Sequence, residues 1–458
     1  MSTTARAANP SQVGGWQRYR RVLRHRNFAL LWMGQTVSWF GDSLYFVSLL
    51  WLVQELTGSR ALMGVVAACR TIPALFGLFA GVLVDRMDRR RIMMVADTVR
   101  ACIVLSVPLL MAAGLLETWH IPVVAFLLAA AGVPFNPSQQ AVLPGIVERE
   151  DLAQANSLLT ISQQFANVIG YAVAGLLIAA IGVGPMFSID AITFLVSVAA
   201  IWAMRLAPAV SNPALAQATS GGQQGGPAGR RPGGRQWWGQ LQEGLHFIKS
   251  QRAMMTVIPL VMLLNFLVAP FAVLLPAWVS DILRAGPGVF GLLQTAITAG
   301  MIAGSLVVGL AAARARRSTL ALGALGGFGL GALLFSLSRT VALTVAIMAA
   351  MGCANTVANI MFVTWAQTIV PKQMMGRVFG ALGTMSQAVS PLGQTLAGFA
   401  GQVLALPLIY GGVGTVLVAV AAVYAAVPVL RGAFNMIESD LSPVTQAAAR
   451  QQVAATRE

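Results

Sequence analysis

Several ionisable side chains of this sequence lie inside long apolar runs, where a charge is costly in a bilayer. Asp42 falls in the run 28–52 and Arg70 in the run 61–84. At 1.5 Å per helical residue, Asp42 lies ~21 Å from one face of a bilayer and Arg70 lies ~14 Å from the other, so their depths agree. We expect Asp42 and Arg70 to form or exchange an ion pair near the midplane, with Asp42 taking up and releasing a proton. A permanent structural pair is the alternative.

The remaining ionisable residues in apolar runs have other expected roles. Asp97 and Arg100 lie within a few turns of the start of the run 92–114, beside a charged loop. We expect them to belong to the charge network of that loop. Asp190 lies close to the start of its own run, and a structural or gating role is expected there. Because every carboxylate in the apolar runs belongs to the first half of the chain, a proton-coupling site would lie in that half.

The second half of the chain has no carboxylate in its apolar runs, but it carries several amides. An amide side chain both donates and accepts hydrogen bonds, so it can contact a substrate without binding a proton. We expect the polar residues of the runs in both halves to line a substrate cavity between the halves: Gln35, Asn136, Gln164, Asn167, Tyr171, Asn265, Gln294, Asn355, Asn359 and Gln387.

The composition indicates a membrane protein. Hydrophobic residues make up 57% of the chain and charged residues 10%, against roughly 25% charged residues in soluble domains. The net charge of +15 does not indicate nucleic-acid binding, because the basic residues gather at the ends of apolar runs rather than in a patch on a soluble fold. The three cysteines lie within apolar runs and the three histidines outside them, so no disulfide, metal or other cofactor is expected. A phosphate-binding loop is missing from the sequence, and we do not expect an enzyme.

About 20 apolar residues are needed to cross a hydrocarbon core of ~30 Å, and the sequence contains twelve such runs in two sets of six. The first set is 28–52, 61–84, 92–114, 121–142, 156–181 and 185–205. The second set is 254–279, 287–311, 318–337, 340–366, 377–403 and 406–430. We expect an all-α membrane protein of twelve transmembrane helices in two pseudo-symmetric six-helix bundles.

The apolar runs divide the chain into five expected segments. The bundles should span residues 28–205 and 254–430. The other segments are a basic amino-terminal segment 1–27, a linker 206–253 that is rich in Gly, Pro, Ser and Gln and ends in a surface helix, and a tail 431–458. Flexible linkers have this composition.

The distribution of basic residues predicts the orientation. Most of the 30 Lys and Arg residues fall on one side of the predicted spans, with Arg60, Arg284 and Arg339 on the other side. Cytoplasmic loops are the ones enriched in Lys and Arg. Both termini are therefore expected in the cytoplasm.

Related residues recur in the fifth and eleventh runs. Gln164 and Gly175 match Gln387 and Gly398 at a constant spacing. Internal repeats of this kind are typical of transporters that are built from two related halves. Chance similarity between alanine-rich helices is the alternative.

The loop between the second and third runs carries the most specific motif. Gly81 is followed after three residues by Asp85 and Arg86, and then by Arg89 and Arg90. This pattern resembles the signature loop of the major facilitator superfamily of transporters. Other residues resemble the bacterial drug:proton antiporters of that family, which include macrolide efflux proteins and the enterobactin exporter: Arg26, Asn27, Phe28, Gly41, Asp42, Arg70, Pro73, Ala96, Asp97, Arg100, Asn136, Pro137, Asp190, Ala191, Gly376 and Arg377.

The resemblance implies that the signature loop acts as a latch. In that family the loop carboxylate, here Asp85, faces the amino-terminal end of the eleventh helix, where Gly376 and Arg377 stand in this chain. A helix amino terminus stabilises a carboxylate. The residues expected to hold the halves together in an outward-open state are Gly81, Asp85, Arg86, Arg89, Arg90, Asp97, Arg100 and Arg377. A loop that only fixes the topology is the alternative.

The resemblance is incomplete in the fifth run. The antiporter signature there has a glycine followed by proline, whereas Gly170 is followed by Tyr171 in this chain. We therefore expect the proline bend of that helix to be absent. Tyr171 is expected either to line the cavity or to pack.

The resemblance implies a transporter that works by alternating access. We expect a monomeric, proton-coupled exporter of amphipathic or hydrophobic small molecules, drugs among them, in the inner membrane of a bacterium. One alternative is an exporter of a single metabolite, such as a siderophore or a lipid-like compound. Another is a membrane sensor or assembly partner that transports nothing, since a fold does not determine a function.

Overall fold

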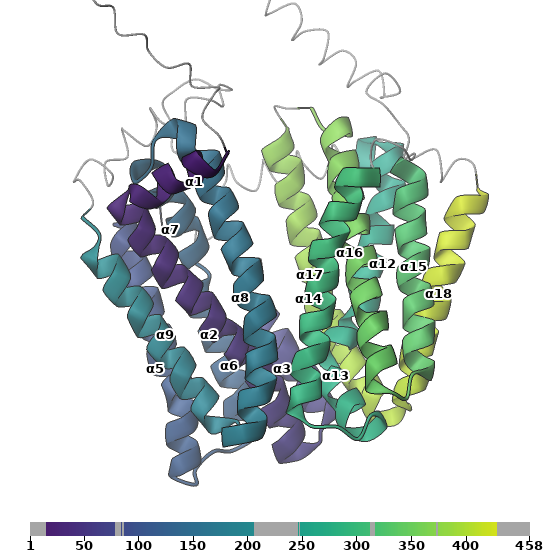
Figure 1. The fold of residues 1–458 in the computed structure, drawn as a ribbon. Helices are drawn as coiled ribbons and strands as arrows, with labels where there is room; N and C mark the ends of the chain where they lie inside the picture. Colours follow the sequence, from purple (N-terminus) through teal and green to yellow (C-terminus); the bar gives the residue numbers. More distant parts are fainter. Residues whose placement is uncertain are drawn as a thin grey trace, which may run out of the picture.

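The structure is a computed structural model that describes residues 15–77, 84, 87–205, 246, 248–311, 317–371 and 374–427. These residues contain helices and no strand, and they form two helical bundles that lie side by side (Figure 1). Ten of the described helices are long and apolar enough to cross a membrane. The predicted all-α membrane fold is therefore confirmed. Two further helices, α3 and α17, belong to the bundles as well, which is consistent with the predicted twelve spans.

The first bundle contains the helices between Arg26 and Ala203. They are α2 (Arg26–Thr57), α3 (Arg60–Thr71), α5 (Arg89–Ala112), α6 (His120–Gly132), α7 (Phe135–Val142), α8 (Leu152–Ile181) and α9 (Gly184–Ala203). A 3-10 helix, Ile72–Phe76, continues α3. The predicted span 121–142 is divided into α6 and α7 at Pro134, since proline has no N–H and its ring clashes with the preceding turn. Residues 206–245 of the predicted linker and the tail from 428 lie outside the described residues.

The second bundle contains the helices between Arg252 and Ala426. They are α12 (Arg252–Val273), α13 (Leu275–Ala277), α14 (Pro287–Ala311), α15 (Arg317–Leu337), α16 (Val341–Ile369), α17 (Met375–Val403) and α18 (Leu406–Ala426). A π-helical turn, Trp278–Ile282, follows α13. Trp278 is fully buried in that turn and packs against Phe335 and Tyr410, with ring centroids 4.6 and 5.3 Å away.

We call the end of the molecule at which α2 begins and α18 ends the upper end, as it lies in Figure 1, and the opposite end the lower end. A short helix, α1 (Gly15–Arg24), lies at the upper end of the first bundle. Arg21 of this helix donates hydrogen bonds of 2.8 and 2.6 Å to the two carboxylate oxygens of Asp151, and this interaction raises the pKa of the guanidinium. The neighbouring Val22 is fully buried. The amino-terminal helix is thus fixed to the bundle by ion pairs of Arg21 with Asp151 and Glu150 and by the apolar side chains of Val22 and Leu23.

Large apolar side chains are exposed on many of the helices. Val403 is 85% exposed, Leu310 78% and Leu337 73%. Many other large apolar side chains are exposed as well, and apolar surface of this extent is uncommon on soluble proteins. Lipid is the environment that such surfaces fit.

The two bundles contact each other in the lower half of the molecule, where α3 meets α17 and α8 meets α14 (Figure 1). Gly64 and Gly398 meet backbone to backbone, because a Cβ atom on Gly64 would lie 2.9 Å from the Gly398 Cα. A Cβ atom on Gly291 would likewise lie 2.9 Å from the Gly175 Cα. Small residues allow helices to approach this closely. Since Gly175 and Gly398 are the glycines repeated in the sequence, the repeat corresponds to two equivalent helix crossings.

Polar contacts hold the lower end closed. The Arg60 guanidinium donates one hydrogen bond of 2.7 Å to the Gly401 carbonyl and forms an ion pair of 2.7 Å with Asp281 in the π-helical turn. Gln54 donates a hydrogen bond of 2.8 Å to Ser280 in the same turn. These contacts join the first bundle to the second at the end where α2 finishes.

Replacing Arg60 with alanine is expected to favour opening of the lower end. The side chains of Arg60 and Asp281 are 25% and 38% exposed, so their pair contributes ~1 kcal/mol, or about a fivefold shift between closed and open forms. Spin labels on cysteines at Leu56 and Leu404, which are exposed near the lower end of each bundle, would report this shift as a larger population of long distances. Asp281→Asn should act similarly, and the two substitutions together should fall short of additivity. An unchanged distance distribution in both variants would contradict the assignment.

Candidate functional site

The interior of the first bundle holds a cluster of charged side chains from four helices. Asp42 lies on α2, Arg70 on α3, Asp97 and Arg100 on α5, and Asp190 on α9. Asp97 and Asp190 are completely buried. Charges inside a membrane protein are rare and usually serve function, so this cluster is the candidate site.

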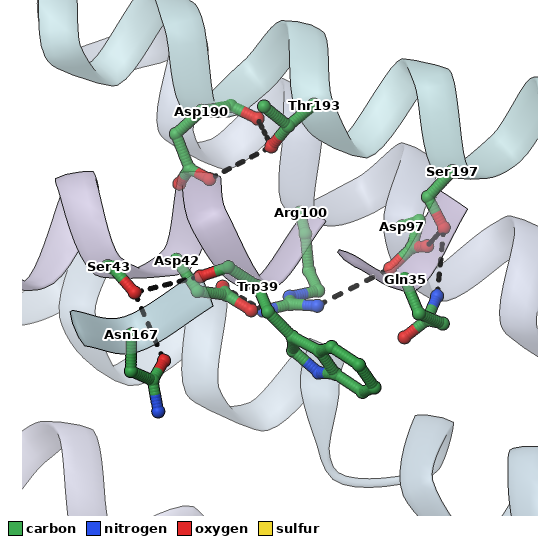
Figure 2. Close-up of polar contacts among 10 residues, drawn as sticks. All are labelled: Gln35, Trp39, Asp42, Ser43, Asp97, Arg100, Asn167, Asp190, Thr193 and Ser197. Carbon is green, nitrogen blue, oxygen red and sulfur yellow. Dashed lines mark hydrogen bonds and ion pairs between the residues drawn. The ribbon is translucent and has the colours of Figure 1, made fainter. Parts of the chain in front are cut away.

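Arg100 is the centre of the cluster (Figure 2). Its Nη2 donates to Asp42 Oδ1 at 2.6 Å, and its Nη1 donates to Asp97 Oδ1 at 3.4 Å. The guanidinium also lies over the Phe194 ring, 4.0 Å from the ring centroid. One cation therefore serves two carboxylates, and a ring of α9 fixes its plane.

A chain of hydrogen bonds fixes Asp97 from its other side. Ser197 donates to Asp97 Oδ2 at 2.6 Å, and Gln35 Nε2 donates to the Ser197 hydroxyl oxygen at 3.1 Å (Figure 2). Asp97, Ser197 and Gln35 come from α5, α9 and α2. Each oxygen of the buried Asp97 thus has a hydrogen-bond partner, as buried carboxylates require. The Asp42 side chain is less buried, at 34% exposed.

The predicted ion pair between Asp42 and Arg70 is not formed, because Arg100 is the partner of Asp42. The Arg70 guanidinium lies over the Phe46 ring, 4.3 Å from its centroid. Asp42 and Arg70 nevertheless line the same cavity. Their similar depths correctly indicated that the two residues lie near each other. The direction of each side chain, however, brings Asp42 to Arg100 of α5 rather than to Arg70.

Asp97 and Arg100, which we assigned from the sequence to the signature-loop network, bind within the cluster around Asp42. Arg89 donates to the Ala141 carbonyl at 2.9 Å and Arg90 donates to the Ile201 carbonyl at 3.1 Å. Both arginines therefore bind their own bundle. Gly81, Asp85, Arg86 and the Arg377 side chain lie outside the described residues, and the latch stays a prediction.

A cavity of about 320 Å³ in the first bundle reaches the charged cluster. Asp42, Arg70 and Arg100 line it, together with the predicted residues Gln35 and Asn136. Other polar or aromatic lining residues were not predicted: Ser38, Trp39, Tyr45, Phe135 and Gln163. The spacing of Gln35, Ser38, Asp42 and Tyr45 at three and four residues, which places side chains on one helix face, is the sequence signal that could have identified two of them.

A second cavity, of about 210 Å³, lies in the second bundle between α12, α15, α16 and α17. The predicted residues Asn265, Asn355 and Asn359 line it, and Ser390 and Gln394 do so as well. The remaining walls are apolar, with Val261, Leu264, Val268, Phe328 and Phe362 among them. This cavity carries hydrogen-bonding groups and no charge.

The other predicted cavity residues line neither of these cavities. Asn167 accepts a hydrogen bond of 3.1 Å from Ser43, and Tyr171 packs against Phe46 with ring centroids 5.6 Å apart. Gln294 is buried, Gln164 is half-buried and Gln387 is exposed. Among the described residues, these two cavities each lie within one bundle, and the predicted polar residues are divided between them; a shared cavity between the halves stays a prediction.

The fifth predicted span, α8, runs as an uninterrupted helix through Gly170 and Tyr171. A Cβ atom on Gly170 would lie 2.5 Å from the Ser43 Cβ. The glycine therefore serves the close packing of α8 on α2. α8 contains no proline.

Comparisons with known proteins agree with this architecture. The family model of the Major Facilitator Superfamily matches residues 31–394. The multidrug efflux pump Tap of Mycobacterium tuberculosis is 27% identical over 365 residues, which cover 78% of this chain and 83% of Tap. Macrolide efflux protein A of Streptococcus pyogenes is 23% identical over 376 residues, which cover 81% of this chain and 88% of that protein.

Solved structures show the same fold at low sequence identity. The nucleoside transporter NupG matches with a TM-score of 0.66 and 15% identity, covering 89% of this chain and 98% of NupG. A bacterial homologue of the iron transporter ferroportin in an inward-facing state matches with a TM-score of 0.62 and 18% identity, covering 89% of this chain and 98% of that one. At these identities the likeness concerns the fold alone.

Proposed function

Because the chain belongs to the major facilitator superfamily of membrane transporters, we propose that it exports amphipathic or hydrophobic small molecules in exchange for protons. The multidrug and macrolide efflux proteins among its relatives support this substrate class. The observation that carries the proposal is the position of Asp42. Asp42 lines the cavity of the first bundle, and Arg100 is the one cation among the described residues that pairs with its carboxylate.

The ion pair between Asp42 and Arg100 can exist in two states that differ by one proton on Asp42. An ionised Asp42 holds the Arg100 guanidinium at 2.6 Å. A protonated Asp42 is neutral and releases much of that attraction, which leaves Arg100 free to bind Asp97 alone. Proton binding at the cavity wall therefore changes the contacts between α2 and α5.

A proton and a substrate can compete at this wall. A cationic or hydrogen-bonding substrate in the cavity would take the place of Arg100 at the Asp42 carboxylate, and protonation of Asp42 would weaken its binding. The amide-lined cavity of the second bundle suits an uncharged part of such a molecule, since its polar groups are Asn265, Asn355, Asn359 and Gln394. Binding either a proton or a substrate, but not both, is the condition for antiport.

The distribution of basic residues supports a cytoplasmic upper end. With that orientation the closed lower end faces outward, as it would in an inward-facing conformation. Alternating access then requires the crossings of α3 with α17 and of α8 with α14 to separate while the upper end closes. We place the protein in the inner membrane of a bacterium as a monomer, with both termini in the cytoplasm and no enzymatic activity.

The experiment that tests the proposal is proton flux in liposomes with an imposed pH gradient. Lipophilic cationic drugs or macrolides are expected to start proton movement in the wild-type protein, and Asp42→Asn is expected to abolish it, because the asparagine cannot take up the proton. Glu117→Gln is the matched control, since Glu117 is exposed in a loop and its replacement should leave the flux unchanged.

Two outcomes would contradict the proposal in different ways. Coupled flux that persists in Asp42→Asn would move the proton site away from Asp42. No substrate-dependent flux with any of these compounds, from a protein that remains folded, would contradict export of drugs.

A further inference from the structure

Asp190 is a completely buried carboxyl group that the proposed exchange at Asp42 does not use. Its Oδ1 lies 3.3 Å from the Thr193 hydroxyl, which also donates a hydrogen bond of 2.8 Å to the Asp190 carbonyl (Figure 2). No described residue forms a hydrogen bond with Asp190 Oδ2. One oxygen of this carboxyl therefore has a shared, long contact and the other has none.

The two nearby cations are engaged elsewhere. Arg100 forms ion pairs with Asp42 and Asp97, and Arg70 lies over the Phe46 ring. Among the described residues, no Lys, Arg or His forms an ion pair with Asp190. The interior cluster thus contains three carboxyl groups and two guanidinium groups, and Asp190 is the carboxyl group that lacks a cation.

Asp190 lies directly against the helix that carries Asp42. A Cβ atom on Gly41 would lie 2.5 Å from Asp190 Oδ1, so only a glycine at position 41 leaves room for this carboxyl group. Asp42 is the next residue of α2 and points to the cavity and Arg100 (Figure 2). The two carboxyl groups therefore belong to one charge cluster, with Asp42 in contact with the cavity and Asp190 sealed behind it.

The groups that face Asp190 come from each helix packed against α9. On α2 they are Asp42 and Tyr45, and on α5 they are Asp97 and Arg100. On α8 the titratable side chain near Asp42 is Tyr171, which packs against Phe46. Two carboxylates and one guanidinium thus act on Asp190, and the guanidinium is already shared by both carboxylates.

An ionised Asp190 would place an unpaired charge in the bilayer interior, next to two other carboxylates. A buried charge without a partner is far more costly than a buried neutral group with an unmet hydrogen bond. We propose that Asp190 is protonated in this conformation and forms a second proton site beside Asp42.

The second proton site would have a role in transport, and this part rests on the proposed function. A proton that leaves the Asp190 O–H bond and bonds to the Asp42 carboxylate makes Asp42 neutral and Asp190 negative. Arg100, whose charge acts on all three carboxyl groups, can then exchange Asp42 for Asp190 as its partner. The total charge of the cluster stays constant, and the buried site passes its proton to the one that faces the cavity.

Infrared spectroscopy of the full chain in lipid tests the protonation directly, because the C=O stretch of a protonated carboxyl lies apart from the bands of carboxylates. At neutral pH we expect this band in the wild-type protein, its loss in Asp190→Asn and its retention in Asp42→Asn. Its absence from the wild type, or its persistence in Asp190→Asn, would overturn the proposal.

Two further measurements keep the test decisive if Asp190→Asn does not fold. Carbon-13 labelling of the aspartate carboxyls should shift the wild-type band, and an unshifted band would exclude an aspartate as its source. Asp190→Glu keeps the acid group in the same pocket and should keep the band at a changed frequency. These readouts need no transport, so their failure is distinct from an absence of drug-driven flux.

Discussion

Replacing Arg100 with methionine is expected to lower the unfolding free energy of the first bundle by about 3–5 kcal/mol, because it leaves two carboxylates without their shared cation. Asp97 is completely buried and Asp42 is 34% exposed, so most of the loss comes from Asp97. Heat unfolding of the purified protein would measure the loss, and coupled proton flux should disappear in the same variant.

The matched controls separate this charge effect from the loss of a long side chain. Adding Asp97→Asn to Arg100→Met should restore most of the stability, since the amide needs no cation and can still bond to Ser197. Arg20→Met removes an exposed arginine of α1 and should change neither stability nor flux. If Arg100→Met were as stable as the wild type, the shared ion pair would not contribute to the free energy of unfolding.

Replacing Gly398 with valine is expected to hold the lower end open. A Cβ atom there would lie 2.7 Å from both the Arg60 carbonyl oxygen and the Gly64 Cα, and backbone atoms cannot move aside as a flexible side chain can. Overpacking of this kind costs ~2 kcal/mol, or about a thirtyfold shift away from the closed form. Spin labels at positions 56 and 404 should then show mainly the longer distance.

Gly383→Val is the control on the same helix, because a Cβ atom at Gly383 would meet nothing within 4 Å. This variant should keep the wild-type distance and transport rate. Gly64→Val should act like Gly398→Val, since the two glycines form one contact. A closed lower end in both Gly64→Val and Gly398→Val would show that the crossing of α3 with α17 adapts to larger residues.

The elements of the fold were largely predictable from the sequence. Apolar runs predict membrane helices because each helix must bury its backbone polar groups internally, whatever its neighbours are. Nine of the predicted runs lie within a few residues of single described helices, and the run 121–142 became α6 and α7 at Pro134. The structure also explains the repeated glycines Gly175 and Gly398, which are the contact points of two equivalent helix crossings.

The sequence was enough to predict the residues of the candidate site, but not which of them form ion pairs with each other. The sequence identified Asp42, Arg70, Asp97 and Arg100 as notable because ionisable residues are rare in apolar runs. From the sequence we expected Asp42 to pair with Arg70, and we expected Arg100 to belong to the network of the signature loop. In the structure Asp42 pairs with Arg100. Asp190 was expected near the start of its helix in a structural or gating role, and the structure places it against Gly41, the residue before Asp42.

The physical reason for this difference is that a sequence position gives the depth of a residue along its helix but not the direction of its side chain across the bundle. The number of spans, the polar residues within them and the orientation expected from the basic loops are properties of each segment and of its transfer into lipid. The partner of each charge, the division of the polar residues between two cavities and the closure of the lower end depend on how helices distant in sequence rotate and pack against one another. The sequence therefore determined which side chains are buried in the membrane, and the tertiary structure decided which of them meet.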